Sequence, residues 1–316
     1  MRMEPTAVES EQARDPAVLT LNGRSYRLVG QTAAELRARR RGTLQGLKKG
    51  QRYSLRLGNR TLQMELRALE RGTRVGSELP RVVDAGVDRV LGHFLITTWV
   101  GDGQNLEEAY FGVREGSWQA PDARKIYANF VPFVQSLFRL HNYAEIIHGD
   151  ISPGNMVRDA TGRFALIDFG FAFPTARTVK RALHEGTPGY AAPEQSKSKW
   201  EDPGRADHGQ VVDFRSDQFA ASAVLYRLLT GNLPYEVSPG EAEPGTRVRP
   251  PSRHNHSVWP ALDRVVLRGL ELDPDRRFPN TRDWLQTLEA ARPPESVMPE
   301  WLTRAGWHLA SWLRRE

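Results

Sequence analysis

Three polar residues lie at a spacing that could serve phosphate chemistry. Asp150 and Asn155 lie in the segment HGDISPGN, which spans residues 148–155, and Asp168 follows thirteen residues after Asn155. A loop carrying the first two, followed by a β-hairpin, would return Asp168 beside that loop. One carboxylate could then face an attacking hydroxyl, while the amide oxygen and the second carboxylate converge on a divalent cation. Because Mg²⁺ prefers oxygen ligands and bridges phosphate oxygens, this spacing predicts phosphoryl transfer.

Short strands dominate the sequence before this segment. Runs rich in Val, Ile, Leu, Tyr and Thr, bounded by glycine, predict strands: Ser25–Val29, Gln51–Leu57, Pro80–Val87 and His93–Val100. Only Thr61–Arg71 shows helical spacing among them. Residues 1–23 are polar without an apolar period, which predicts a flexible arm.

Helical periodicity dominates after Gly103. The expected helices are Ala123–Asn142, Ser216–Thr230, Trp259–Glu271 and Thr281–Ala291. Between the first two, Asn155–Arg158 and Phe164–Asp168 predict the hairpin, joined by the turn at residues 159–162. We therefore expect an α+β protein with an arm (1–23), a small sheet lobe (24–103), a larger helical lobe (104–292) and a tail (293–316).

Composition narrows the class of protein. The chain has 316 residues with 39% hydrophobic and 26% charged residues, which is typical of a globular protein. It contains no cysteine, which excludes disulfides and thiolate chemistry and fits a reducing compartment. No apolar run approaches the length of a membrane span, and the acidic start lacks the apolar core of a secretory signal. We expect a cytoplasmic protein without a transmembrane segment.

Positive charge gathers in the first third of the chain. Residues 25–104 hold fifteen Arg or Lys and seven Asp or Glu, although the whole chain has a net charge of only +6. Arg37 and Arg39–Arg41 allow three interpretations: a solvated face, a phosphate-binding cluster, or a contact for nucleic acid or an acidic partner. His254 and His256 have no carboxylate pattern around them, so we expect surface residues and no metal–histidine site.

Several motifs resemble a known family. HGDISPGN is similar to the catalytic loop of the eukaryotic-like protein kinases found in many bacteria, and Asp168-Phe169-Gly170 matches the family's Asp-Phe-Gly motif. GTPGYAAPE at 186–194 is similar to the substrate-docking segment with its closing Ala-Pro-Glu. The resemblance runs from about residue 24 to residue 288. It implies a bilobal protein-kinase-like fold with a small antiparallel-sheet N-lobe and a larger helical C-lobe.

The resemblance also implies roles for individual residues. Asp150 would orient the substrate hydroxyl and accept its proton, while Asn155 and Asp168 would hold Mg²⁺ on the phosphates of ATP. Thr97 would be the gatekeeper, and Thr98–Val100 would be the hinge that meets adenine. Met156, in the floor hairpin, would also contact the nucleotide. Residues implied to support the loop and substrate docking are His148, Thr187, Glu194, Asp217 and Arg277, the last paired with Glu194.

Four departures from the family concern ATP binding and its control. Residues 29–35 hold one glycine where the family has a glycine-rich turn. Arg56 stands at the position of the phosphate-binding lysine, with Glu65 as its expected helix partner. Ser152 replaces a lysine that contacts the γ-phosphate, and Gly149 replaces an arginine that senses activation-loop phosphorylation. This last change suggests control that does not require such phosphorylation.

Three functions remain open from the sequence. The first is an ATP- and Mg²⁺-dependent serine/threonine protein kinase acting on an unknown protein substrate. The second is a pseudokinase scaffold or allosteric partner, favoured by Arg56 and the missing glycines. The third is a small-molecule phosphotransferase. The sequence of the loop at 148–155 also resembles the loop of such enzymes, but they lack a segment like that at 186–194. Trp301, Trp307 and Trp312 predict a helical tail that packs on the C-lobe, with a partner or membrane surface as the alternative.

Overall fold

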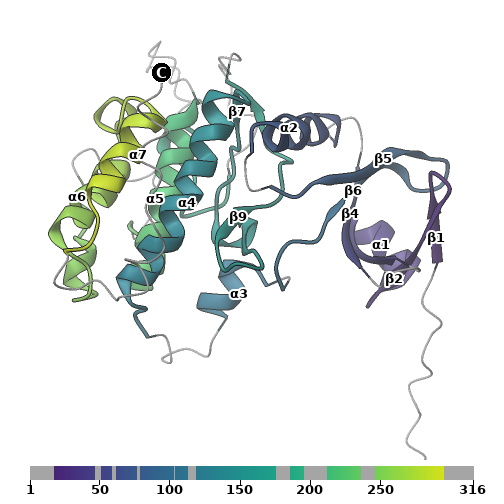
Figure 1. The fold of residues 1–316 in the computed structure, drawn as a ribbon, viewed down its shortest axis with the longest axis horizontal. Helices are drawn as coiled ribbons and strands as arrows, with labels where there is room; N and C mark the ends of the chain where they lie inside the picture. Colours follow the sequence, from purple (N-terminus) through teal and green to yellow (C-terminus); the bar gives the residue numbers. More distant parts are fainter. Residues whose placement is uncertain are drawn as a thin grey trace, which may run out of the picture. The chain divides into compact units, whose positions relative to one another are not determined.

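The computed structural model describes residues 18–46, 51–58, 62–76, 79–102, 104–112, 119–175, 186–195, 212–235 and 246–294. The chain divides into two compact units (Figure 1). The first contains residues up to Leu66 together with Arg81–Trp99, and the second contains Arg67–Pro80 together with Val100 onward. The predicted tryptophan-rich tail lies outside the described residues.

A curled antiparallel sheet forms the first unit. Within the described residues it has six strands in the order β1-β2-β3-β4-β6-β5. Their bounds are β1 Val18–Leu21, β2 Arg24–Val29, β3 Arg41–Gly46, β4 Arg52–Gly58, β5 Val82–Asp88 and β6 Gly92–Thr98. Two side chains from the start of the sheet reach its far edge, because Asn22 Nδ2 donates to Asp84 Oδ1 (2.8 Å) and Arg24 Nη1 to the Val83 carbonyl (3.2 Å). The sheet therefore curls toward closure.

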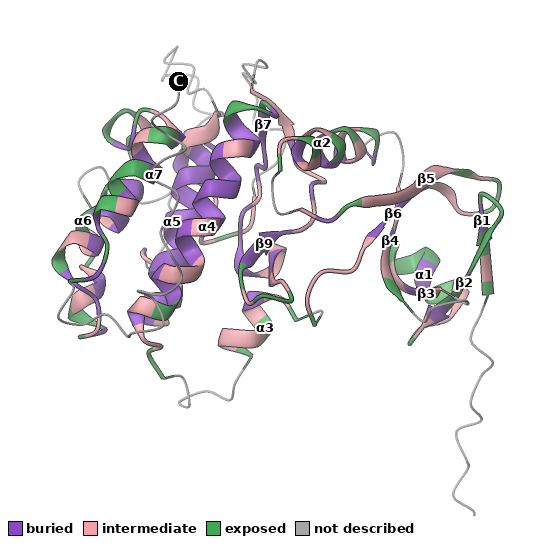
Figure 2. Cartoon of the chain, viewed as in Figure 1, coloured by how far each residue is buried: buried purple, intermediate pink, exposed green. Residues whose placement is uncertain are grey.

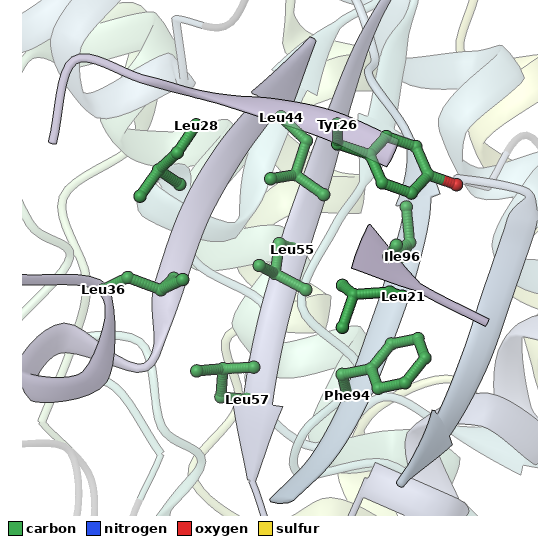
Figure 3. Close-up of a cluster of buried hydrophobic side chains, with 9 residues drawn as sticks. All are labelled: Leu21, Tyr26, Leu28, Leu36, Leu44, Leu55, Leu57, Phe94 and Ile96. Carbon is green, nitrogen blue, oxygen red and sulfur yellow. The ribbon is translucent and has the colours of Figure 1, made fainter. Parts of the chain in front are cut away.

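One face of this sheet encloses the core of the first unit. Nine buried side chains gather there (Figure 3): Leu21, Tyr26, Leu28, Leu36, Leu44, Leu55, Leu57, Phe94 and Ile96. Eight of them come from strands, and Leu36 comes from α1, Ala33–Arg39. Alternation along each strand directs every second residue inward and its neighbours outward, so the opposite face remains available for polar side chains.

Two predictions for the first third of the chain were wrong in part: the flexible arm at residues 1–23, and a single helix among the strands. Residues 18–21 belong to β1, because Asn22 and Gly23 adopt the left-handed conformation that a two-residue hairpin turn requires. The helix α1 and the strand β3 were also missed. Thr32 and Glu35 form a capping box that starts α1, since each side chain accepts a hydrogen bond from the other residue's backbone N–H.

Helices make up most of the second unit. Their bounds are α2 Leu62–Arg74, which begins in the first unit, α3 Leu106–Phe111, α4 Ala123–Asn142, α5 Phe214–Thr230, α6 Pro260–Gly269 and α7 Thr281–Ala290. α4 has the predicted bounds, and the others differ from prediction by one to three residues at their ends, except α3, for which no bounds were predicted. Figure 2 shows α4 and α5 as largely buried helices, and α5 carries Asp217 in its first turn.

Short strands complete the second unit. Two pairs occur in its described residues: β7 Ile146–Ile147 with β10 Phe173–Pro174, and β8 Met156–Arg158 with β9 Phe164–Leu166. The second pair is the predicted hairpin, shortened because Asn155 belongs to a 3₁₀ turn at Pro153–Asn155 and because β9 ends before Ile167. No helix in the described part of the chain is long and apolar enough to span a membrane.

Candidate active site

Asp217 anchors the loop that carries Asp150. Its carboxylate accepts the peptide N–H groups of His148 (2.7 Å, at Oδ2) and Gly149 (2.8 Å, at Oδ1), and Oδ2 also lies 2.9 Å from His141 Nε2. Burial alone would raise the pKa of Asp217, but the hydrogen bond and charge of His141, together with His148, lower it below its ordinary value. The first turn of α5 thus holds the loop through a buried, ionised carboxylate.

Both carboxylate oxygens of Asp150 are fixed by neighbours. Thr187 donates to Oδ1 through its N–H (2.8 Å) and its hydroxyl (2.6 Å). Asn155 Nδ2 donates to Oδ2 (2.8 Å) and to the Asp150 carbonyl (2.9 Å). The docking segment and the loop therefore both hold the Asp150 carboxylate. A carboxylate that orients a hydroxyl must itself be held in a fixed position, and this one is.

The β8–β9 hairpin returns the chain to this loop. Met156 pairs with Leu166, and the Ile167 N–H donates to the Asn155 carbonyl at 2.9 Å, which holds Asp168 next to the Asn155 segment. Asp168 has φ 64°, a left-handed conformation that costs free energy in a non-glycine residue and often marks a functional site. Phe169 beyond it is buried against the His148 ring, with centroids 4.8 Å apart.

The donor chemistry of Asn155 and Asp168 fits Mg²⁺. Asn155 directs its amide nitrogen to Asp150, so the amide oxygen points elsewhere. Within the described residues, no group of three or more His, Asp or Glu side chains could hold a metal ion by itself. An amide oxygen and a carboxylate suit Mg²⁺, which proteins bind through one or two side-chain oxygens together with phosphate oxygens.

Gly149 satisfies a backbone constraint. It has φ 79°, and a Cβ at this position would lie 2.9 Å from the Phe171 carbonyl oxygen. Gln195 Nε2 donates to its carbonyl at 2.8 Å. Ser152 is buried at 3% exposure, and it stands where the family that the sequence resembles has a lysine.

A buried ion pair fixes the end of the docking segment. Arg277 contacts Glu194 through two bonds, Nη1 to Oε1 (2.7 Å) and Nη2 to Oε2 (2.9 Å), and Ser216 Oγ donates to Oε1 (2.7 Å). Burial would raise the pKa of Glu194, but the charge and hydrogen bonds of Arg277 lower it below its ordinary value. The expected pairing of Arg277 with Glu194 is present in the structure.

The expected nucleotide-binding residues divide between the two units. Arg56, Glu65, Thr97 and Thr98 belong to the first unit, whereas Val100 and the fully buried Met156 belong to the second. Arg56 Nη1 contacts Glu65 Oε1 at 2.9 Å, so this expected pair is also present. Thr97 is buried at 8% exposure, and the Thr98 N–H donates to the Arg81 carbonyl (2.8 Å).

Sequence reasoning missed several supporting residues. His141 connects Asp217 to Thr281, whose Oγ1 lies 2.8 Å from His141 Nδ1. Gln195 closes the docking segment, because its Oε1 accepts the Ala192 N–H while its Nε2 holds Gly149. A polar residue on the apolar face of a predicted helix was the available signal for His141.

Comparisons with known proteins agree with this geometry. The family model for the protein kinase domain matches residues 84–281. Serine/threonine-protein kinase PknB of Mycolicibacterium smegmatis is 36% identical over 141 residues, which are 42% of this chain and 21% of that protein. Serine/threonine-protein kinase PksC of Streptomyces coelicolor is 30% identical over 211 residues, which are 63% of this chain and 35% of that protein.

A solved structure supports the fold alone. The Cydia pomonella granulovirus kinase PK-1 matches with a TM-score of 0.62 at 16% identity, covering 78% of this chain and 88% of that one. The matched segments span between about a fifth and a third of the length of the two curated relatives. Because the family model covers well over half of the residues and the fold agrees with it, the chain belongs to the protein kinase family, alongside the bacterial Hanks-type serine/threonine kinases.

Proposed function

We propose that this chain is an active, ATP- and Mg²⁺-dependent protein kinase that transfers the γ-phosphoryl group to a serine or threonine hydroxyl of a protein. The observation that carries the proposal is the Asp150 carboxylate, held by Thr187 of the docking segment on one oxygen and by Asn155 on the other. The family membership and the names of the curated relatives support it.

The proposed chemistry assigns each residue one task. Asp150 accepts a hydrogen bond from the substrate hydroxyl and orients its oxygen toward the γ-phosphorus. It takes the hydroxyl proton as the new P–O bond forms and the bond from the γ-phosphorus to the bridging oxygen breaks, so that ADP leaves. Asn155 and Asp168 would hold Mg²⁺, which when bound neutralises charge on the phosphate oxygens. Thr187 and Asp217 keep Asp150 in place through the hydrogen bonds described above.

Two departures favour the pseudokinase alternative. Arg56 replaces the lysine, and α1 lies where the family has the glycine-rich turn. A phosphotransferase for small molecules is disfavoured, because Thr187, in the segment at 186–195, donates a hydrogen bond to the Asp150 carboxylate. The protein substrate, a partner at the tail and a cytoplasmic location stay predictions.

The test is transfer of labelled phosphate from ATP with Mg²⁺, to a generic protein acceptor and to hydroxylated metabolites in parallel. Asp150→Asn should lower transfer to protein by about 10²-fold or more, because a positioned base contributes about 10²–10⁴-fold. Its ATP affinity by calorimetry should match the wild type, since Asp150 faces the hydroxyl. Full turnover by Asp150→Asn would remove this residue from the mechanism, and ATP binding by a wild type that transfers nothing would favour the pseudokinase.

A further inference from the structure

Arg227 lies in the last turn of α5, the helix whose first turn carries Asp217. Its Nη1 donates to Glu107 Oε2 at 2.7 Å and its Nη2 to Glu107 Oε1 at 3.0 Å, so two parallel bonds form this ion pair. The same Nη1 also donates to the hydroxyl of Tyr190. One guanidinium group therefore joins α5 to α3 and to the docking segment.

The helix α3 presents two side chains to this guanidinium group. Glu107 and Phe111 are four residues apart, so they lie on the same face of the helix. The carboxylate binds the fork, and the Phe111 ring lies against the guanidinium carbon, with Cζ 3.9 Å from the ring centroid. A fork that binds a carboxylate and stacks on a ring is a geometry that arginine provides and lysine does not.

This contact is partly shielded from water. The Arg227 side chain is 20% exposed and that of Glu107 is 44% exposed, whereas Tyr190 is buried. An exposed ion pair contributes little by itself, because water competes for both charges. Here the second bond, the stacked ring and the buried hydroxyl add to the ion pair and fix the position of the guanidinium group.

The two groups that meet at the docking segment keep one charge state each. Burial raises the pKa of Tyr190 to about 12, although the hydrogen bond and charge of Arg227 act in the opposite direction. Burial alone would lower the pKa of Arg227, but its contacts with Tyr190 and Glu107 raise it above its ordinary value. The phenol thus stays neutral and the guanidinium stays charged near neutral pH, so this contact does not act as a pH switch.

Backbone hydrogen bonds connect Tyr190 to the residue that holds Asp150. The N–H groups of Tyr190 (3.1 Å) and Ala191 (3.0 Å) both donate to the Thr187 carbonyl, which closes a tight turn. Thr187 in turn donates to Asp150 Oδ1 through its N–H and its hydroxyl. The turn is therefore held at one end by Asp150 and at the other end by Arg227.

The helix α3 reaches the loop by a separate route. Asn105, directly before α3, forms a bridge with Val157 of β8, and α3 contacts the 3₁₀ turn that ends at Asn155. Because Arg227 binds α3 and the docking segment at once, it fixes the docking segment relative to the loop that carries Asp150.

We propose that Arg227 is a positioning residue for the protein acceptor: it fixes the docking segment against α3, so that a hydroxyl bound there meets Asp150. This inference rests on the proposed function for the identity of the acceptor. It adds Arg227, Glu107 and Tyr190 to the site, and the proposed reaction assigns none of them to ATP. Loss of the contact should therefore impair use of the acceptor and leave ATP affinity unchanged.

The experiment is steady-state transfer of phosphate from ATP with Mg²⁺ to casein, with ATP affinity measured by calorimetry. Arg227→Ala should raise the KM for casein by about tenfold or more, the fold-change expected for loss of a charge-assisted hydrogen bond. It should lower kcat less, since Thr187 still holds Asp150. ATP affinity should stay within about twofold of the wild type. Arg227→Lys should recover part of the loss, because lysine keeps the charge without the fork.

Two further variants separate positioning from stability. Tyr190→Phe removes only the hydroxyl and should also raise the KM for casein, and its effect should not add to that of Arg227→Ala, because both changes break one contact. Arg268→Ala is the matched control: Arg268 lies in the last turn of α6, stacks on Phe278 with Cζ 4.3 Å from the centroid, and donates to the Arg277 carbonyl. This control should lower the melting temperature and leave the KM for casein at the wild-type value. Fully additive effects of Arg227→Ala and Tyr190→Phe would count against the shared contact.

Hydrogen exchange keeps this test independent of kinase activity. In Arg227→Ala, and not in Arg268→Ala, the amides of Tyr190 and Ala191 should exchange faster than in the wild type, whether or not the chain transfers phosphate. Faster exchange in a chain whose wild type transfers nothing to casein would support the contact and count against the kinase activity. A wild-type KM in an active Arg227→Ala variant, or unchanged exchange at these two amides, would overturn the positioning role and leave the kinase proposal standing.

Discussion

At the scale of single residues, the loop and hairpin of the second unit keep the polar residue types that the family has there, whereas the positions implied to carry phosphate-binding cations do not. Asp150, Asn155 and Asp168 are present, and Thr187 and Asp217 hold the first of them. The resemblance to the family places Arg56 and Ser152 at positions where the family has lysines. In the proposed kinase reaction, transition-state charge must then be stabilised by fewer or differently shaped cations, which predicts slow phosphoryl transfer.

Substitution of Arg56 tests whether the guanidinium is a working replacement. Arg56→Ala should lower the melting temperature, because it removes a charge-assisted contact of about 1.5–3 kcal/mol from buried Glu65. It should also weaken ATP binding, because the proposed function assigns Arg56 to the phosphates. Arg56→Lys keeps the charge and should retain part of both properties. Thermal melts and calorimetry on the two variants separate the effects. Loss of stability with unchanged ATP affinity in Arg56→Ala would show that Arg56 serves the fold only.

At the scale of elements, α1 closes the core of the first unit. Its residue Leu36 is fully buried in the core, together with Leu28. A Cβ built on Gly42 would lie only 2.8 Å from Leu36 Cδ1 and 3.3 Å from Leu28 Cδ1. The helix α1 is therefore packed against the sheet through Leu36, and it is not a loose connection between β2 and β3. Any movement of this connection would have to break the packing of Leu36.

Leu36→Ala should destabilise the first unit by about 2–5 kcal/mol, the usual cost of removing a buried leucine side chain. The measurement is chemical denaturation followed by hydrogen exchange at the backbone amides of β2, β3 and β4, which belong to the first unit. Arg37→Ala, an exposed change on the same helix, should leave the transition in place. If both variants unfold like the wild type, α1 does not contribute to the core in solution.

At the scale of the whole molecule, buried ionised groups couple stability to pH. The pKa values of Glu194 and Asp217 lie below their ordinary values in the folded state, so the unfolded chain binds more protons in acid. Their contribution to stability is complete above the ordinary carboxyl range and is lost as pH falls through the lowered folded values. Stability should accordingly be level near neutrality and fall below about pH 4.

Glu194→Gln should reduce stability at neutral pH by about 3–5 kcal/mol, because it leaves the buried Arg277 cation without its carboxylate. The variant should also lose stability less steeply than the wild type below about pH 4, since one titrating group is gone. Urea unfolding at several pH values measures both effects. Glu271→Gln, an exposed change, is the control. An equally steep acid limb in Glu194→Gln would mean that this pair does not govern acid unfolding.

Local sequence determined most of the second unit. The α4 helix has its predicted bounds because apolar residues repeat at spacings of three and four, and these are the residues it buries. The hairpin that brings Asp168 back to the loop follows from two short apolar runs and a turn. Both are short-range patterns, and both lie within residues 84–281, which the family model matches.

Only the tertiary structure decided how the first unit is built and where its charges meet. Strand β1 and helix α1 each depend on a few residues: the left-handed turn at Asn22 and Gly23, and the capping box of Thr32 and Glu35. The opposition of Arg41 and Arg56 depends on strand register, and a shift of one residue would have placed Arg41 in the core. Register is set by the packing of Leu36, Leu44 and Leu55 from separate elements, a long-range interaction that no local pattern records.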